Sequence, residues 1–124
     1  MLPPQQDPQP RPASETVVRT APLLEKNQYW LEKIIRLCRE EGIELWLVKS
    51  PSNLELEEKA MLNTVEATAA RYGVPFHEFN QDYGAIGLDE TMFFDAHHLD
   101  ALGASRFTRW FAAVLTTAHP DLVP

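Results

Sequence analysis

An aspartate and two histidines lie within four positions of one another near the C-terminus, at Asp95, His97 and His98. Asp95 stands three residues before His98, and in a tight turn this spacing brings a carboxylate beside an imidazole. Such a carboxylate accepts a hydrogen bond from Nδ1–H, fixes the ring tautomer and stabilises the imidazolium that proton uptake creates. The Nε2 atom would then face a substrate as a general base. A turn-capping aspartate and a packing histidine fit the same short pattern, and spacing alone does not choose between His97 and His98.

The same cluster offers a second chemistry, because carboxylates and imidazoles are also metal ligands. Its four candidate ligands are Asp95, His97, His98 and Asp100. Adjacent histidines rarely both reach one ion from a short turn, and no second ligand pair stands at a recognisable spacing. We therefore expect no metal and no cofactor, and we keep a small metal-dependent hydrolase as an alternative.

A general base of this kind needs a nucleophile to activate, and the chain offers few. Its four serines are Ser14, Ser50, Ser52 and Ser105. Ser50 and Ser52 follow a predicted strand, at the end where open α/β sheets bind their ligands, and they precede the aspartate and the histidine. They lack the glycine-rich surroundings of a sharp nucleophile turn, so a loop role is the plainer interpretation. The single cysteine, Cys38, is expected inside a helix as a buried structural thiol.

Three amphipathic helices and two strands are predicted around this cluster. Apolar residues recur at helical spacing over residues 24–41, 54–72 and 101–117. A nearly continuous apolar run, typical of a short buried strand, covers residues 43–48, and residues 74–79 are predicted to form a second short strand. A strand, a crossover helix and a second strand form a βαβ unit, so we predict that the two strands are parallel. Asp100 can cap the last helix, and residues 80–92 are expected to form a loop.

The first predicted strand raises a question about the completeness of the sheet. Parallel strands normally belong to larger sheets that are covered on both faces, and residues 43–48 are too apolar for an open edge. We therefore expect the terminal portion of a larger doubly wound fold, completed by a missing segment or by another chain. The same edge suggests an alternative function, a non-catalytic module that binds a partner or a second copy by strand addition.

Length and composition bound these interpretations. With 124 residues the chain forms at most one domain. We expect a disordered Pro-rich leader at residues 1–20, an α/β region at 21–119 and a tail at 120–124. The net charge is −7 and the cations are scattered without a basic stripe, which argues against a nucleic-acid partner. Because no leader of secretory type or apolar run of membrane-spanning length is present, we expect a cytoplasmic protein with no membrane partner.

The stretch from Asp95 to Ala104 resembles the final block of the SGNH (GDSL-type) hydrolases, in which Asp-x-x-His is often followed by Leu-Asn-x-x-Gly and a closing helix. Asp100 here replaces the more usual asparagine. Three earlier stretches resemble, in order, the helix before a late strand, the end of that strand with its loop, and the last strand of the family. They are residues 29–43, 47–53 and 72–80, and the likeness covers residues 24–116.

The resemblance implies a flavodoxin-like α/β/α sandwich of about five parallel strands, of which this chain would contribute the last two with three main helices. It implies that His98 is the base, that Asp95 orients it, and that they serve a serine in acyl-ester hydrolysis, often on carbohydrate esters. The blocks that carry the nucleophile and the oxyanion donors should precede Tyr29, where nothing like them is found. The resemblance therefore implies a C-terminal fragment or a degenerate member, inactive alone, with a small ester or carbohydrate ester as substrate.

Overall fold

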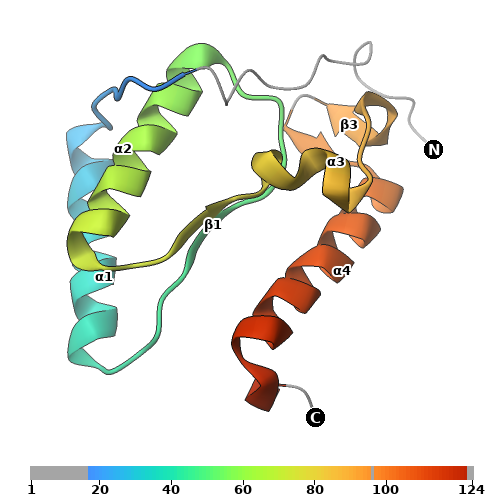
Figure 1. Cartoon of the computed structure of the whole chain (residues 1–124). Helices are drawn as coiled ribbons and strands as arrows, with labels where there is room; N and C mark the ends of the chain where they lie inside the picture. The colour runs from blue at the N-terminus through green and yellow to red at the C-terminus, as the bar shows by residue number, and fades with distance from the viewer. Residues whose placement is uncertain (1–16, 96, 123–124) are drawn as a thin grey trace. The chain divides into compact units, whose positions relative to one another are not determined.

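A computed structural model of the chain describes residues 17–95 and 97–122. These residues form a mixed α/β structure with four α-helices, a two-stranded parallel sheet and a small antiparallel hairpin (Figure 1). They divide into two compact units. The sheet unit contains residues 17–49 and 54–78, and the hairpin unit contains residues 50–53 and 79–122.

The sheet unit is a βαβ arrangement preceded by a helix. Its elements are α1 (Glu25–Glu40), β1 (Leu47–Lys49), α2 (Leu56–Tyr72) and β2 (Phe76–Glu78). The two strands pair in parallel, with Leu47 opposite Phe76 and Lys49 opposite Glu78, as the crossover connection predicts. Both strands are shorter than predicted. Pro75 has no N–H and offers the carbonyl that accepts from the Leu47 amide, so the ladder of β2 begins after it.

The ends of the helices follow from their local sequence. Glu55 and Glu58 form a reciprocal capping box at the start of α2, each side chain accepting from the other residue's amide. Gly73 ends α2 with φ +71°, and Gly42 follows α1 with φ +69°. Both glycines therefore adopt the left-handed conformation that their positions after a helix favour.

Residues 17–21 lie along α2 and are held by its side chains. The Asn63 side-chain amide donates to the carbonyl oxygens of Val17 and Arg19, at 3.0 and 2.8 Å. The Ala21 amide donates to the Ala60 carbonyl at 3.1 Å. Of the predicted leader, residues 17–20 are therefore hydrogen-bonded to the helix, and residues 1–16 lie outside the described residues.

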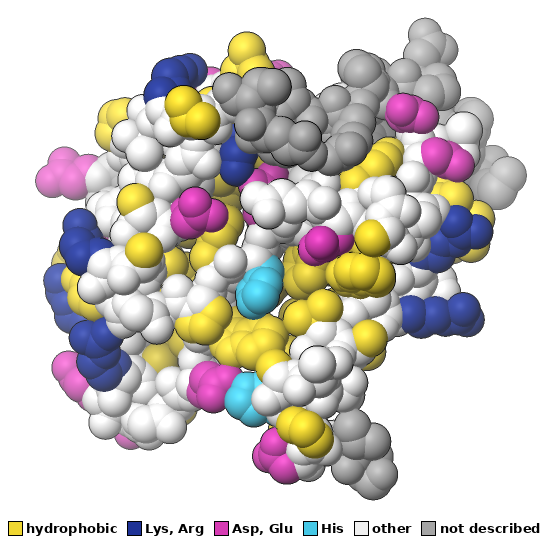
Figure 2. Space-filling model, viewed as in Figure 1, with side chains coloured by type: hydrophobic (Ala, Val, Ile, Leu, Met, Phe, Trp, Pro, Cys, Tyr) yellow, Lys and Arg dark blue, Asp and Glu magenta, His cyan; other side chains and the backbone are white. Residues whose placement is uncertain are grey.

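The charged and apolar surfaces of the sheet unit differ from the sequence prediction. Val48 in β1 is 42% exposed, so this strand is not buried on both faces. On α1, Trp30, Ile34 and Leu37 are about half exposed, and Cys38 is half-buried rather than buried. Two strands provide too little sheet to cover a helix face and both strand faces. Lysine and arginine side chains gather along the left margin of Figure 2, over α1 and α2.

The hairpin unit is built from short elements and one long helix. They are a 3₁₀ turn (Phe79–Asp82), α3 (Tyr83–Ile86), a second 3₁₀ turn (Glu90–Met92), β3 (Phe93–Asp95), β4 (His98–Leu99), α4 (Ala101–Ala118) and a last 3₁₀ turn (Pro120–Leu122). The predicted loop over residues 80–92 is therefore largely helical, in single turns. Such turns are too short to show a helical period, but they bury Phe79, Tyr83 and Ile86.

The core of the hairpin unit is aromatic. Phe79 is 1% exposed, and its ring lies 5.2 Å from that of Phe107 and 5.5 Å from that of Phe111, both on α4. Tyr83 stacks on Phe93 with 6.2 Å between ring centroids. These contacts fix α4 against the turn that carries the aspartate and the histidine. Among the described residues, no helix is long and apolar enough to cross a membrane.

Candidate active site

The hairpin between β3 and β4 brings the predicted acid and base together. Asp95 is the last residue of β3 and His98 is the first residue of β4, and the antiparallel register places them opposite each other. The pairing is irregular between Phe93 and Asp95, which gives the local bend of a bulged ladder. The spacing of three residues predicts a contact between these two side chains, and the short turn produces it.

The carboxylate of Asp95 accepts two hydrogen bonds on one oxygen. The Nδ1 atom of His98 lies 2.7 Å from Oδ1, and the backbone amide of His97 donates to the same oxygen at 2.8 Å. The His97 amide, followed by the His98 ring, holds the pKa of the Asp95 carboxyl below its ordinary value. Asp95 therefore remains ionised and accepts from Nδ1–H at neutral pH.

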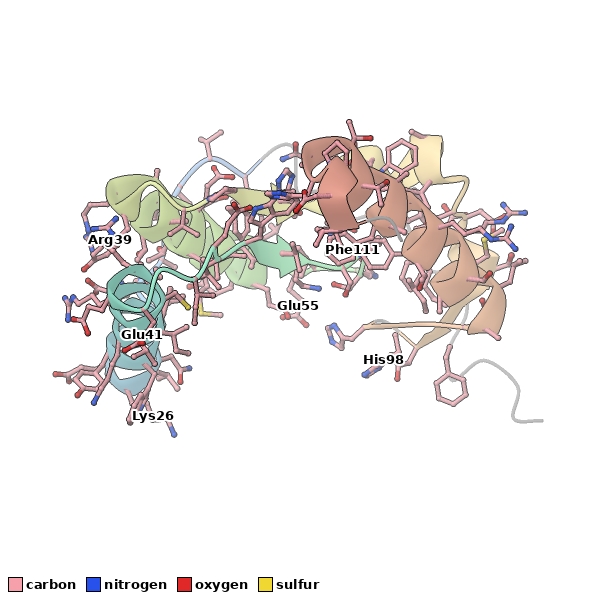
Figure 3. All side chains as sticks on the ribbon, turned by 90° about the horizontal axis from the view of Figure 1, so that it is seen from below. Lys26, Arg39, Glu41, Glu55, His98 and Phe111 are labelled. Carbon is pink, nitrogen blue, oxygen red and sulfur yellow. The ribbon has the colours of Figure 1, made fainter. Side chains whose placement is uncertain are left out.

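The imidazole of His98 is open to solvent on its other side. Its side chain is 72% exposed, whereas that of Asp95 is 31% exposed. Figure 3 labels His98 on the hairpin. Since Nδ1 faces the carboxylate, Nε2 is the nitrogen left to take or give a proton. His97 is also exposed, and it contributes its backbone amide to Asp95. The geometry thus distinguishes His98, which meets the acid through its ring, from His97, which meets it through the main chain.

The start of α4 supports the hairpin through Asp100 and Gly103. The Asp100 side chain accepts from the Gly103 amide at 2.8 Å, which confirms the predicted N-cap. The Asp100 amide donates to the Met92 carbonyl at 2.7 Å. A Cβ atom at Gly103 would lie 2.7 Å from that carbonyl oxygen and 2.9 Å from Leu99 Cδ2. Gly103 therefore permits a close approach of α4 to β4, a role that residue type and spacing alone do not reveal.

The two candidate nucleophiles differ in their access to solvent. Ser52 is 1% exposed, and its amide donates to the Asn80 side-chain oxygen at 3.1 Å. A serine buried to this extent is closed to a substrate, which argues against Ser52. Ser50 is exposed and is the accessible candidate of the two. Asn80 is itself 1% exposed and holds the loop of residues 50–53, a contact that the sequence does not signal.

The predicted metal ligands do not form a cage. Across residues 17–95 and 97–122, no group of three or more His, Cys, Asp or Glu side chains is arranged to hold a metal ion. Asp100 faces the amide of Gly103, and Asp95 faces two N–H donors of its own turn. The cluster is therefore an acid–imidazole pair beside a capped helix.

Comparison with family models, curated proteins and solved structures finds no match to this chain. The resemblance to the SGNH hydrolases accordingly rests on the residues that carry it.

Proposed function

We propose that Asp95 and His98 form the acid–imidazole half of a serine ester-hydrolase site of the SGNH type. The observation that carries the proposal is the 2.7 Å contact between Asp95 Oδ1 and His98 Nδ1, with the ring 72% exposed. In this function Nε2 accepts the proton of a serine hydroxyl as its oxygen attacks the ester carbonyl. The resulting imidazolium, stabilised by Asp95, then donates that proton to the leaving alcohol.

The proposed substrate is a small acyl ester, including O-acetyl esters of carbohydrates. Support for the fold assignment comes from the parallel pairing of β1 and β2, followed by an Asp-x-x-His turn directly before the closing helix. In this proposal the chain supplies the last two strands of a flavodoxin-like sandwich, and a further segment or chain completes it. The nucleophile is then Ser50 or a serine of that completing segment.

Hydrolysis by this chain alone is expected to be slow. A tetrahedral intermediate needs N–H donors aimed at its oxyanion, and removing even one such donor costs an enzyme about 10²-fold in rate. By resemblance those donors belong to blocks that precede Tyr29. The pair can still act as a general base toward an activated ester, because this step needs the imidazole and its carboxylate alone.

The test is hydrolysis of p-nitrophenyl acetate by the full chain. We expect His98→Ala to lower the rate by about 10²-fold and Asp95→Asn to lower it less, since the ring remains but loses its orientation. His97→Ala is the matched control, because it removes a neighbouring imidazole and keeps the amide that donates to Asp95. Equal rates for the wild type and His98→Ala would refute the proposal. Ser50→Ala then separates attack by Ser50 from attack by water.

A second candidate function is self-association through the edge of β1. Within the described residues β1 pairs with β2 on one side, and Val48 on this strand and the nearby Ile43 are 42% and 57% exposed. Apolar side chains beside an open strand edge favour pairing with a second copy of the chain. Sedimentation at increasing protein concentration tests this function, and Val48→Lys should shift the protein toward the monomer. A concentration-independent monomer would exclude it.

A further inference from the structure

Three arginines surround one tyrosine where α1 and α2 lie side by side. The guanidinium carbons of Arg36, Arg39 and Arg71 lie 5.9, 5.5 and 5.3 Å from the centroid of the Tyr72 ring. Arg36 and Arg39 come from α1, whereas Arg71 and Tyr72 end α2. We call these four residues the Tyr72 cluster. It belongs wholly to the sheet unit, away in sequence from the acid–imidazole pair of the hairpin unit.

Arg36 and Arg71 each donate one hydrogen bond, through Nη2, to a side chain beside the Tyr72 ring. Arg36 donates through Nη2 to the Tyr72 hydroxyl at 3.1 Å, and Arg71 donates through Nη2 to Glu32 at 2.8 Å. A guanidinium carries five N–H donors in a planar fork, and the Arg36 and Arg71 side chains are 59% and 61% exposed. Stacking on the tyrosine therefore holds the charged groups in place while most of their donors face solvent.

One carboxylate, Glu32, pairs with two of the three guanidiniums of the cluster. The Glu32 side chain, 19% exposed, pairs with Arg71 at 2.8 Å and with Arg36 at 3.6 Å, and it accepts from the Tyr72 hydroxyl at 2.6 Å. The Tyr72 hydroxyl, followed by Gln28, lowers the pKa of Glu32, so this carboxylate is ionised. The three guanidiniums of the cluster outnumber this paired carboxylate on a chain of net charge −7, and Figure 2 shows cationic side chains, with acidic ones among them, along this margin.

A structural role accounts for part of the cluster. Arg39 donates to the Tyr72 carbonyl oxygen, which lies at the C-terminal end of α2 where a cation is favourable. Arg36 and Arg71 differ, because their hydrogen bonds described here go to the side chains of Tyr72 and Glu32 rather than to helix carbonyls. A ligand can therefore bind Arg36 and Arg71 without breaking the hydrogen bond from Arg39 to the last turn of α2.

A groove beside the cluster gives room for the rest of a ligand. Its volume is about 860 Å³, and it shares Glu32 and Arg71 with the cluster. Pro22, Leu23 and Ala67 supply apolar walls, whereas α1 lines the groove with Glu25, Gln28, Tyr29 and Glu32. Arg71 is the arginine of the cluster that lines the groove, so an anionic group held by Arg71 leaves room there for a small organic body.

We propose that Arg36 and Arg71, with Arg39 behind them, bind the phosphate group of a small soluble phosphomonoester. Guanidinium forks match phosphate oxygens in two parallel hydrogen bonds, which a compact ammonium cannot do. The net charge of −7 repels nucleic acid and anionic membranes, so the ligand is a small molecule rather than a polyanion surface. This proposal goes beyond ester hydrolysis and stands independently of it.

Titration calorimetry of the full chain with inorganic phosphate and phenyl phosphate, at constant ionic strength, tests the site. We expect phenyl phosphate to bind more tightly, because its ring enters the groove. Arg71→Gln and Arg36→Gln should each weaken binding by about tenfold. Arg109→Gln removes an equal charge from an exposed position of α4 and should leave the affinity unchanged.

Glu32→Gln separates a ligand site from a merely structural cluster. It removes the competing carboxylate, so phosphate affinity should rise severalfold, whereas a structural cluster would lose stability without gaining affinity. If Glu32→Gln does not fold by circular dichroism, Arg36→Lys keeps the charge, loses the fork and should weaken binding. Three outcomes overturn the proposal: equal losses in Arg36→Gln and Arg109→Gln, full affinity in Arg36→Lys, and tighter binding to phosphatidic acid vesicles than to phenyl phosphate.

Discussion

The sheet unit and the hairpin unit bury different kinds of side chain. In the hairpin unit, aromatic rings meet around Phe79, which is 1% exposed. In the sheet unit, the most buried positions include the small Ala60 and Ala69, both 0% exposed, and the ion pair of Lys59 with Glu78. Apolar burial contributes about 25 cal/mol per Å², so the rings give the hairpin unit the larger gain per residue.

Polar contacts join α1 to α2 beside the buried Ile35 of α1. Gln28 donates to Thr68 at 3.1 Å, and the Tyr72 hydroxyl donates to Glu32 at 2.6 Å. Meanwhile Trp30, Ile34 and Leu37 remain about half exposed on α1. Large rings therefore fill the core near the acid–imidazole pair, whereas the sheet unit combines a core of smaller apolar side chains with a buried ion pair and side-chain hydrogen bonds. Four substitutions test this difference.

The largest effect is expected from Phe79→Ala, which empties the centre of the aromatic core. Loss of the ring contacts to Phe107 and Phe111 and the resulting cavity should lower the free energy of unfolding by about 4 kcal/mol. Urea titration measures the loss. Leu122→Ala, at a position 60% exposed, is the control and should change stability by less than about 0.5 kcal/mol. A small effect of Phe79→Ala would show that the aromatic core is not the main source of stability in the hairpin unit.

Lys59→Met should be the most destabilising change to the polar interior of the sheet unit. The two side chains of the Lys59–Glu78 pair are 7% and 1% exposed, so removing the Lys59 cation leaves the Glu78 carboxyl buried without this partner. We expect a loss of about 3 kcal/mol in the free energy of unfolding, measured by urea titration. The double variant with Glu78→Leu should recover much of it, because two apolar side chains replace two charges. Failure of this recovery would show that Glu78 has a further role.

Gly103→Ala tests the close approach of α4 to the hairpin. The added Cβ would meet the Met92 carbonyl and Leu99, so we expect a loss of about 2 kcal/mol in the free energy of unfolding. Gly84→Ala is the matched control, since nothing lies within 4 Å of its Cβ and alanine favours a helix. If both substitutions behaved alike, the contact at Gly103 would not position α4.

The smallest effect is expected from Asp95→Asn as a function of pH. The folded-state pKa of Asp95 is lowered, so its contribution to stability is present above the ordinary value of about 3.9 and is lost as pH falls through the folded pKa. The difference in unfolding free energy between the wild type and Asp95→Asn should therefore shrink below about pH 4. A difference that stays constant down to pH 2 would contradict the lowered pKa, which carboxyl NMR titration measures directly.

Much of the fold follows from the local sequence. The parts that cannot be predicted from it share one cause, a sequence signal that is too weak. Helices of many residues show their period, so α1, α2 and α4 begin and end within two residues of the predicted bounds. The single turns in residues 79–92 and the two strands of the hairpin are too short to show one. The strand over residues 43–48 is displaced because continuous apolar sequence does not mark where a ladder begins.

The contacts at the candidate sites also divide into local ones, which the sequence predicts, and distant ones, which it does not. The contact between Asp95 and His98 is local and follows from a spacing of three residues. The hydrogen bond between the Ser52 amide and Asn80 joins positions 28 residues apart. The hydrogen bond between Arg36 and Tyr72 joins positions 36 residues apart. Sequence spacing carries no signal for such contacts, because they depend on how whole elements pack. The scattered cations of the sequence therefore become a cluster only in the folded chain.

The Asp95 carboxylate accepts from the His98 ring and from the His97 amide, and the second hydrogen bond does not depend on the protonation of the ring. An imidazole changes its donors when it gains and loses a proton, but the main-chain N–H of His97 remains a donor throughout. This amide therefore holds the Asp95 carboxylate whichever protonation state the His98 ring has.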